Sequence, residues 1–244
     1  MRLAAVSAVG LVLFFWPFLG TKAPPETLVL AAALACLAAL LALETGTRRL
    51  DSRGLALLAA LAAIDTALRM AVVAGLGGFN PIFFMIICAG FVFGPTYGFL
   101  VGSSSLLVSG FMTGGLGPWV PYQMFGAGWV GAVAGLVGLG WAGRYGPIQV
   151  VVLAAVGAVL GFAFGALMDI QVWVFGFRGS PGLGWAPGMG PLQALGNFGR
   201  FYLLTSLAYD SFRAVGNALM VLALGPAVIA ALARVRRRLS FAVV

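Results

Sequence analysis

Three aspartates lie inside long apolar stretches of this chain, where an ionised side chain is costly. They are Asp65, Asp169 and Asp210. A charge at the centre of a bilayer costs at least roughly 2.5–3.5 kcal/mol, so such residues mark a binding site, an ion pathway or a neutralising pair. Arg69 follows Asp65, and Arg213 follows Asp210, at the spacing of one helical turn. Each of these two couples is either a structural ion pair or part of a site. Asp169 has no such neighbour and is the better functional candidate.

The last apolar segment carries a polar stripe. Ser206, Asp210, Arg213 and Asn217 are spaced at i, i+4, i+7 and i+11, which places them within about 60° of one another on a helix. Lipid offers such groups no hydrogen-bond partner. We therefore expect the stripe to face the interior of a helix bundle.

Composition identifies the environment of these side chains. Hydrophobic residues make up 62% of the 244 residues, charged residues make up 8%, and the mean hydropathy is +1.08. No water-soluble domain of this size sustains such values, so we expect a polytopic membrane protein. The net charge of +8 comes from basic residues scattered at the ends of apolar segments. It therefore reports membrane topology, and no nucleic-acid partner is expected.

The sequence lacks the residues that most catalytic and metal sites need. It contains no histidine, and its two cysteines, Cys36 and Cys88, lie singly in apolar runs as structural thiols. It has no GxxxxGK[ST] phosphate loop and no Ser/His/Asp or Cys/His constellation. We predict that the protein is not an enzyme, binds no metal and uses no cofactor.

A membrane-spanning helix needs about 20 apolar residues. By that measure we expect an all-α integral membrane protein of eight segments, with two leading helices followed by a group of six. Residues 79–112 are too long for one span, and Gly94-Pro95 divides them into two short helices. The N-terminus has no small-x-small cleavage site after its apolar core, so we treat it as a span. The other expected spans are 3–19, 27–45, 54–76, 121–141, 148–175 and 202–232.

The distribution of basic residues predicts the orientation. With a cytoplasmic N-terminus, nine basic residues lie inside and three outside, as the positive-inside rule requires. The loops 77–80, 113–121 and 176–201 then face outward. The chain divides into residues 1–53, a six-helix core at 54–232 and a basic cytoplasmic tail at 233–244. The inner residues are Arg2, Arg48, Arg49, Arg53, Arg144, Arg234, Arg236, Arg237 and Arg238; the outer ones are Lys22, Arg178 and Arg200.

Small residues at four-residue spacing predict close helix packing. Gly94, Gly98 and Gly102 form one such row, and Gly131 and Gly135 form another. The helix at 54–76 differs, because an alanine stripe runs along the face opposite Asp65 and Arg69. This stripe packs either inside the bundle or against a second protein. Its members are Ala56, Ala59, Ala60, Ala63 and Ala67.

Residues 90–138 and 201–225 resemble the substrate-binding S component of energy-coupling factor (ECF) transporters, of the bacterial vitamin-uptake type. The most specific part is GPWVPYQM at 117–124 with the glycine-rich helix that follows it. The likeness covers most of 54–232, whereas residues 1–45 depart from the usual six-helix plan by adding two spans.

The resemblance implies a capture subunit in the plasma membrane. It would bind a vitamin or related micronutrient at its outer face and associate with a transmembrane coupling subunit and two cytoplasmic ATPases. In that family an alanine motif on the first core helix contacts the coupling subunit, and the alanine stripe matches it here. Aromatic-rich outer loops with few charges favour a bulky, weakly charged ligand, such as a cobalamin-like or flavin-like vitamin, over a phosphate ester.

Residues 113–121, a loop rich in glycine and proline between two expected spans, become a candidate lid over the ligand if the chain is a capture subunit. Its glycines and prolines give a compact path, while Trp119, Tyr122 and Gln123 offer stacking and hydrogen-bonding groups. An interfacial aromatic belt is the competing explanation. The expected substrate-binding residues are Asn80, Trp119, Tyr122, Gln123, Asp169, Trp173, Asn197, Arg200, Asp210, Arg213 and Asn217.

Two other functions remain open. A stand-alone secondary transporter would use Asp65, Asp169 or Asp210 as a proton or ion carrier. The third hypothesis is a membrane enzyme or an assembly scaffold. The sequence supports it less, because it contains no catalytic constellation.

Overall fold

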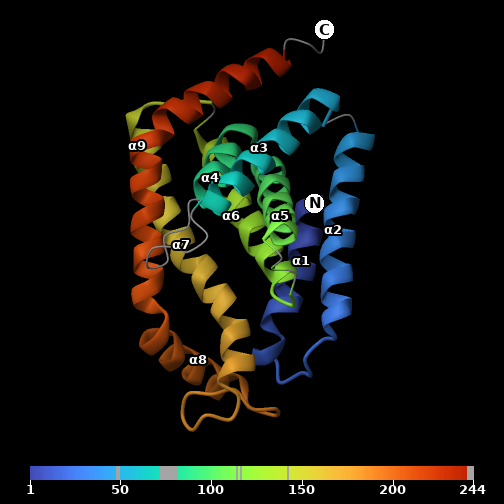
Figure 1. Cartoon of the computed structure of the whole chain (residues 1–244), viewed down its shortest axis with the longest axis vertical. Coiled ribbons are helices and arrows are strands. Elements are labelled where there is room, and N and C mark those ends of the chain that lie inside the picture. The colour runs from blue at the N-terminus through green and yellow to red at the C-terminus, as the bar shows by residue number, and fades with distance from the viewer. Residues whose placement is uncertain (48–49, 72–81, 114, 116, 142, 241–244) are drawn as a thin grey trace.

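The structure, a computed structural model, describes residues 1–47, 50–71, 82–113, 115, 117–141 and 143–240. Within these ranges it is helical and has no strand (Figure 1). The elements are α1 (Arg2–Phe15), the one-turn 3₁₀ helix η1 (Trp16–Phe18), α2 (Glu26–Gly46), α3 (Ser52–Ala71), α4 (Ile82–Phe93), α5 (Pro95–Met112), α6 (Val120–Gly140), α7 (Pro147–Gly176), α8 (Pro191–Thr205) and α9 (Leu207–Ser240).

Four of the described helices are long and apolar enough to cross a membrane: α2, α6, α7 and α9. At 1.5 Å per residue, the 14 residues of α1 and the 12 residues of α4 are each shorter than the roughly 30 Å of a hydrocarbon core. The all-α membrane character is therefore supported. The arrangement of two leading and six core spans stays a prediction.

The predicted break at Gly94-Pro95 is confirmed, whereas residues 79–81 of the predicted segment lie outside the described residues. α4 ends at Phe93, Gly94 adopts a positive φ of 100°, and Pro95 begins α5. Glycine reaches this conformation without a steric penalty, and proline suits the first turn of a helix because it has no N–H to satisfy. The two residues therefore separate the helices with a minimal turn.

The prediction of a single helix starting at residue 202 is wrong. α8 covers Pro191–Thr205, and α9 begins at Leu207 and continues to Ser240. Ser206 is the C-terminal cap of α8 and lies just before α9, where its carbonyl accepts a hydrogen bond from the Asp210 backbone N–H at 2.9 Å. The glycines of 176–201 indicated a loop, but from Pro191 onward the chain forms α8, a 15-residue helix that lies across one end of the molecule between α7 and α9 (Figure 1).

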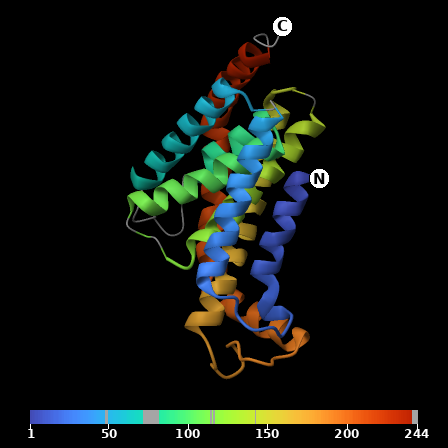
Figure 2. The same ribbon diagram turned by 90° about the vertical axis from the view of Figure 1, so that its right-hand side faces the viewer.

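Close packing of α4, α5 and α6 depends on glycine. A Cβ atom on Gly131 of α6 would fall on the backbone of Gly98 in α5, and one on Gly98 would fall on the carbonyl of Gly131. Gly135 faces the backbone of Pro95 in the same way. The packing predicted from the small-residue rows is confirmed for these helices. Figure 2 shows α5 crossing α6 obliquely.

Helix α1 belongs to the folded body. Phe14 is fully buried, with its ring 5.0 Å from the ring of Tyr122 and 5.4 Å from that of Trp129. The indole N–H of Trp129 donates to the hydroxyl of Ser7 at 3.1 Å. The N-terminal helix therefore packs directly on α6.

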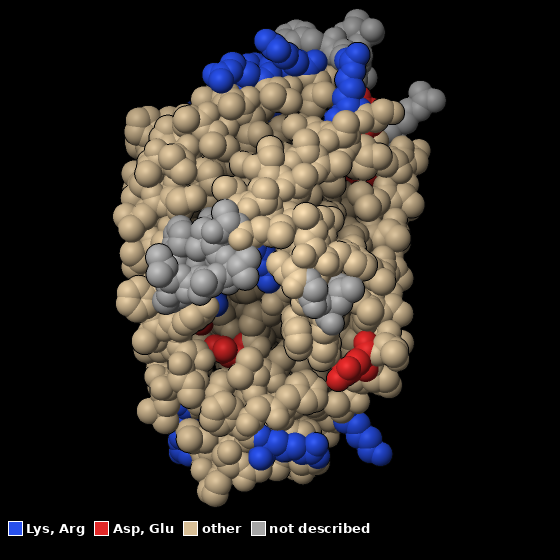
Figure 3. All heavy atoms as spheres, in the orientation of Figure 1, with Lys and Arg blue, Asp and Glu red and all other residues tan. Residues whose placement is uncertain are grey.

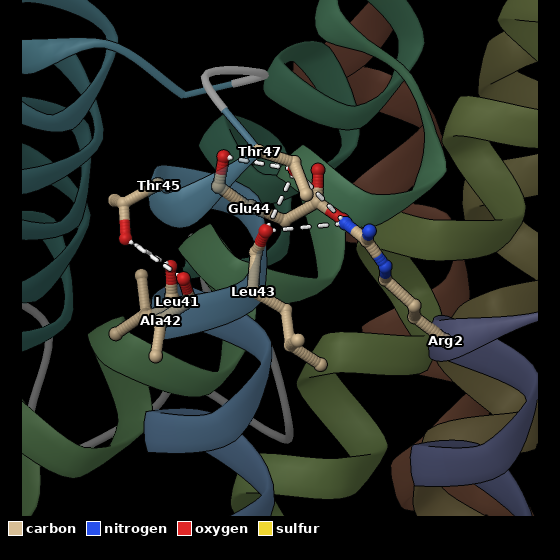
Figure 4. Close-up of polar contacts among 7 residues, drawn as sticks. All are labelled: Arg2, Leu41, Ala42, Leu43, Glu44, Thr45 and Thr47. Atoms are coloured by element: carbon tan, nitrogen blue, oxygen red, sulfur yellow. Dashed lines mark hydrogen bonds and ion pairs between the residues drawn. The ribbon is translucent and has the colours of Figure 1, made fainter.

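Arg2 joins α1 to the last turn of α2 (Figure 4). Its guanidinium donates to the Leu43 carbonyl at 3.1 Å, to the Glu44 carboxylate at 3.2 Å and to the Thr47 hydroxyl at 3.0 Å. Carbonyls at the C-terminal end of a helix lack intrahelical partners, so a cation stabilises them.

Arg2→Met is expected to lower the free energy of unfolding by about 1 kcal/mol, because the arginine is partly exposed and its bonds are screened by solvent. Thermal unfolding in detergent measures the change. Arg234→Met, at an exposed arginine of α9, is the matched control. An equal loss in both variants would contradict a specific role for the α1–α2 contact.

The C-terminal part of α9 turns across the end of the molecule opposite α8 (Figures 1 and 2). Pro226 lies inside this helix, where its ring prevents the normal hydrogen bond and favours a kink. Arg236 donates to the Val92 carbonyl at 2.7 Å and to the Tyr145 hydroxyl at 3.1 Å. The helix thus continues through residues 233–240 of the predicted basic tail.

Candidate functional site

The predicted site residues lie in three separate places. Trp119, Tyr122 and Gln123 line a cavity beside α6 and α7. Asp169, Asp210 and Arg213 lie between α7 and α9, with Asn217 two turns further along α9. Trp173, Asn197 and Arg200 hold the segment between α7 and α8. Asn80 lies outside the described residues.

The first place is a cavity of about 510 Å³, which we name the Trp119 cavity. The loop before α6, the first turn of α6, the second half of α7 and the first residue of α2 form its wall. Its size falls in the usual range for small-molecule sites. The lining residues are Glu26, Pro118, Trp119, Tyr122, Gln123, Met168, Gln171, Val172 and Phe175.

The loop holds Trp119 in place by a local hydrogen bond. Its indole N–H donates to the Gly115 carbonyl at 3.1 Å, and its ring packs so close to Gly117 that a Cβ there would touch it. The ring remains 50% exposed. The loop's glycines therefore allow a large aromatic side chain to fold back over the cavity wall.

Gln171 is a site residue that the sequence interpretation missed. Its side chain is 8% exposed and lines the Trp119 cavity, and neither its amide nitrogen nor its amide oxygen has a hydrogen-bond partner among the described residues. An unpaired buried amide costs free energy, which a bound ligand or water would recover. Met168, Gln171 and Phe175 recur at i, i+3 and i+7 on one face of α7, a pattern that could have indicated it.

The second place is a charged cluster around Asp210, which is almost fully buried. Its carboxylate pairs with the guanidinium of Arg213 and accepts a hydrogen bond from the Tyr202 hydroxyl at 3.0 Å. The Arg213 guanidinium also lies 5.7 Å from the Phe164 ring centre and 5.1 Å from that of Tyr209. The predicted Asp210–Arg213 pair is confirmed.

Tyr202, whose hydroxyl donates a hydrogen bond to this cluster, lies on α8. This helix is not one of the four described helices that are long and apolar enough to cross a membrane. Burial, together with the hydrogen bond to the Asp210 carboxylate, raises the pKa of Tyr202 above its ordinary range. The phenol therefore stays protonated at physiological pH and acts as a donor to Asp210. On α7, Asp169 has one buried carboxylate oxygen with no partner among the residues described.

Of the two alternatives for Asp65 and Arg69, the structural ion pair is not found among the contacts of the described residues. Asp65 is fully buried, and neither carboxylate oxygen has a hydrogen-bond partner in the described part of the chain. Arg69 instead donates to the Ser109 hydroxyl of α5 at 2.8 Å, and Thr66 donates to the Ser105 carbonyl at 3.3 Å. These contacts across α3 and α5 replace the local pair that the sequence spacing favoured.

The third group of predicted site residues makes hydrogen bonds within the protein. The indole N–H of Trp173, which is fully buried, donates to the Leu183 carbonyl at 2.7 Å. The Asn197 amide donates to the Gly184 carbonyl at 2.9 Å, and Arg200 donates to that of Gly182 at 3.4 Å. Asn217 similarly donates across to the Gly157 carbonyl of α7 at 3.2 Å. These side chains hold backbone segments in position.

The five alanines of the predicted stripe are all exposed, whereas Asp65 and Thr66 on the same helix are buried. The predicted division of α3 into an alanine face and an inward polar face is therefore confirmed. Figure 3 shows this side of the molecule, which is hollowed below mid-height with acidic and basic atoms in the hollow.

Comparisons of the chain with protein-family models, with curated proteins and with solved structures found no match. Within the described ranges, no group of three His, Cys, Asp or Glu side chains could hold a metal ion. The functional argument therefore rests on the cavity and the buried charges.

Proposed function

We propose that this chain is the substrate-capture subunit of an ATP-driven ECF-type importer in a bacterial plasma membrane. One observation carries the proposal: Trp119, Tyr122 and Gln123, which the sequence indicated as a lid, line one cavity of small-molecule size. In this proposal the α8 end faces outward, both termini are cytoplasmic, and six core spans follow two leading spans. A vitamin or related micronutrient enters from the α8 end.

The exposed alanines of α3 support the proposed association with a transmembrane coupling subunit. A stripe without large side chains lets another helix approach closely in lipid, where packing drives association. A transmembrane coupling subunit would contact this face, and two ATPases bound to that subunit would supply the energy. The chain itself carries no phosphate loop for ATP.

Purification from the native host in mild detergent tests this assignment. We expect a coupling subunit and two ATPases to be recovered with the wild-type chain and lost with Ala63→Leu/Ala67→Leu, because the leucines prevent close helix approach. Ala31→Leu/Ala35→Leu is the matched control, since these alanines are also exposed and one turn apart, on α2. Recovery of the chain alone, under conditions that preserve other complexes, would contradict the importer assignment.

A second candidate function has its own observation in its favour. The buried Asp65 carboxylate without a partner in the described part of the chain is what a proton carrier in a secondary transporter would require. That function predicts uptake that collapses with an uncoupler and needs no ATPase. Uptake assays with an uncoupler therefore distinguish the two.

A further inference from the structure

The Trp119 cavity has a distinctive charge. Among the described residues that line it, Glu26 is the one charged side chain, and no Lys or Arg is present. Lys22 and Arg178 line a neighbouring cavity of about 480 Å³, and Phe175 borders both. The two cavities therefore present opposite charges. An anionic ligand would meet a carboxylate in the Trp119 cavity and find no basic partner along its described wall.

The aromatic side chains of the cavity favour the same sign of ligand charge. Trp119, Tyr122 and Phe175 belong to its wall, and the faces of such rings attract cations through their quadrupoles. A carboxylate next to several rings is the combination that binds organic ammonium groups. Inorganic cations would need more oxygen ligands than one carboxylate and two amides.

Gln171 determines which hydrogen-bonding groups a ligand in this cavity must carry. Its buried amide offers one acceptor and two donors, and the described part of the chain satisfies none of them. Gln123 lines the same cavity from α6. A ligand that carries a neighbouring donor and acceptor, such as an amide or an amino-heteroaromatic edge, would satisfy the Gln171 side chain.

We infer that the Trp119 cavity binds a small organic cation, with its cationic group near Glu26 and the aromatic rings, and a hydrogen-bonding edge at Gln171. This inference rests on the proposed function in taking the cavity as the substrate site, and it narrows the ligand to a class smaller and more positive than a cobalamin-like molecule. It also gives α2, one of the two leading helices, a direct role, because Glu26 is its first residue.

Calorimetric titration of the purified chain with benzyltrimethylammonium tests the inference. We expect saturable binding of this cation, with benzyl alcohol and benzoate binding at least about tenfold more weakly, because they lack the charge or reverse it. No saturable binding of the cation, or benzoate binding as tightly, would overturn the inference. The assay needs no coupling subunit, so its outcome is independent of whether ATPases are recovered with the chain.

Variants locate the binding. Glu26→Gln and Trp119→Ala are each expected to weaken benzyltrimethylammonium binding about tenfold while the thermal midpoint stays unchanged, since both side chains are exposed. Asp51→Asn removes the same charge at the other end of the molecule and keeps the oxygen that caps Gly54, so binding should not change. Equal affinities of wild type and Glu26→Gln would overturn the assignment.

A lipid headgroup could supply the same ammonium chemistry as a free solute. Repeating the titration in phosphatidylglycerol nanodiscs, with and without phosphatidylethanolamine, distinguishes these sources. Unchanged affinity for the probe supports a free solute as the natural ligand. Competition by phosphatidylethanolamine supports a headgroup in the same cation site.

Discussion

Arg213→Met is expected to lower the free energy of unfolding by about 3–5 kcal/mol, the range found when one partner of a buried ion pair is removed. Asp210 is 1% exposed, and the Arg213 side chain is 12% exposed. Without the guanidinium, the carboxylate keeps only the Tyr202 hydroxyl as a partner among the described residues. Methionine keeps an apolar stem but lacks the guanidinium, so a second variant is needed to separate the loss of charge from the loss of volume.

Two further variants make this prediction specific. Asp210→Asn/Arg213→Met should recover more than half of the loss, because a neutral amide replaces the uncompensated charge. Arg234→Met is the matched control: this arginine is exposed on α9, and its change should stay within about 0.5 kcal/mol. Thermal unfolding in detergent measures all three. A double variant no more stable than Arg213→Met would contradict an ion-pair origin of the effect.

Gly131→Ala is expected to cost roughly 3 kcal/mol or more, at the upper end of overpacking effects. The new Cβ would fall on the carbonyl and Cα of Gly98. Backbone atoms cannot rotate away as a side chain can, so α5 and α6 would have to separate. Because α4 packs on the same glycine face through Gly90, the separation would disturb three helices.

Gly140→Ala is the control on the same helix. Among the described residues, and apart from its chain neighbours and its own helix backbone, no heavy atom lies within 4 Å of a Cβ at this position. We expect no loss, and a gain of up to about 1 kcal/mol from the higher helix propensity of alanine. Thermal unfolding and gel filtration in detergent compare the two variants. If Gly131→Ala unfolds at the same temperature as Gly140→Ala, the close approach of α5 and α6 is not what stabilises this core.

The long helices could be predicted from the sequence because their signals are local. Apolar runs of sufficient length and Gly-Pro interruptions define most boundaries, including the break at Gly94-Pro95. The exposed alanine face of α3 and the Asp210–Arg213 pair also followed from spacing along a helix. Helix α8 was missed, since it is too short and too rich in glycine for a span.

The site was only partly predictable. Trp119, Tyr122 and Gln123 stood out as large amphipathic groups in a glycine-rich loop, and they do line one cavity. Gln171 and Glu26 complete that cavity from α7 and α2, and nothing in their local sequence joins these helices. Trp173 and Asn197 were equally conspicuous in the sequence, yet they donate hydrogen bonds to the segment between α7 and α8.

The sequence by itself determined which parts of this chain are apolar helices, where most of them end and which charges lie at their ends, because these properties depend on neighbours within a few residues. The tertiary structure decided how the charges are used. Arg69 lies four residues after Asp65 but bonds to Ser109, forty residues away, because α5 packs against α3. The unpaired amide of Gln171 likewise lines a cavity only because residues of α2 and α6 pack around this part of α7.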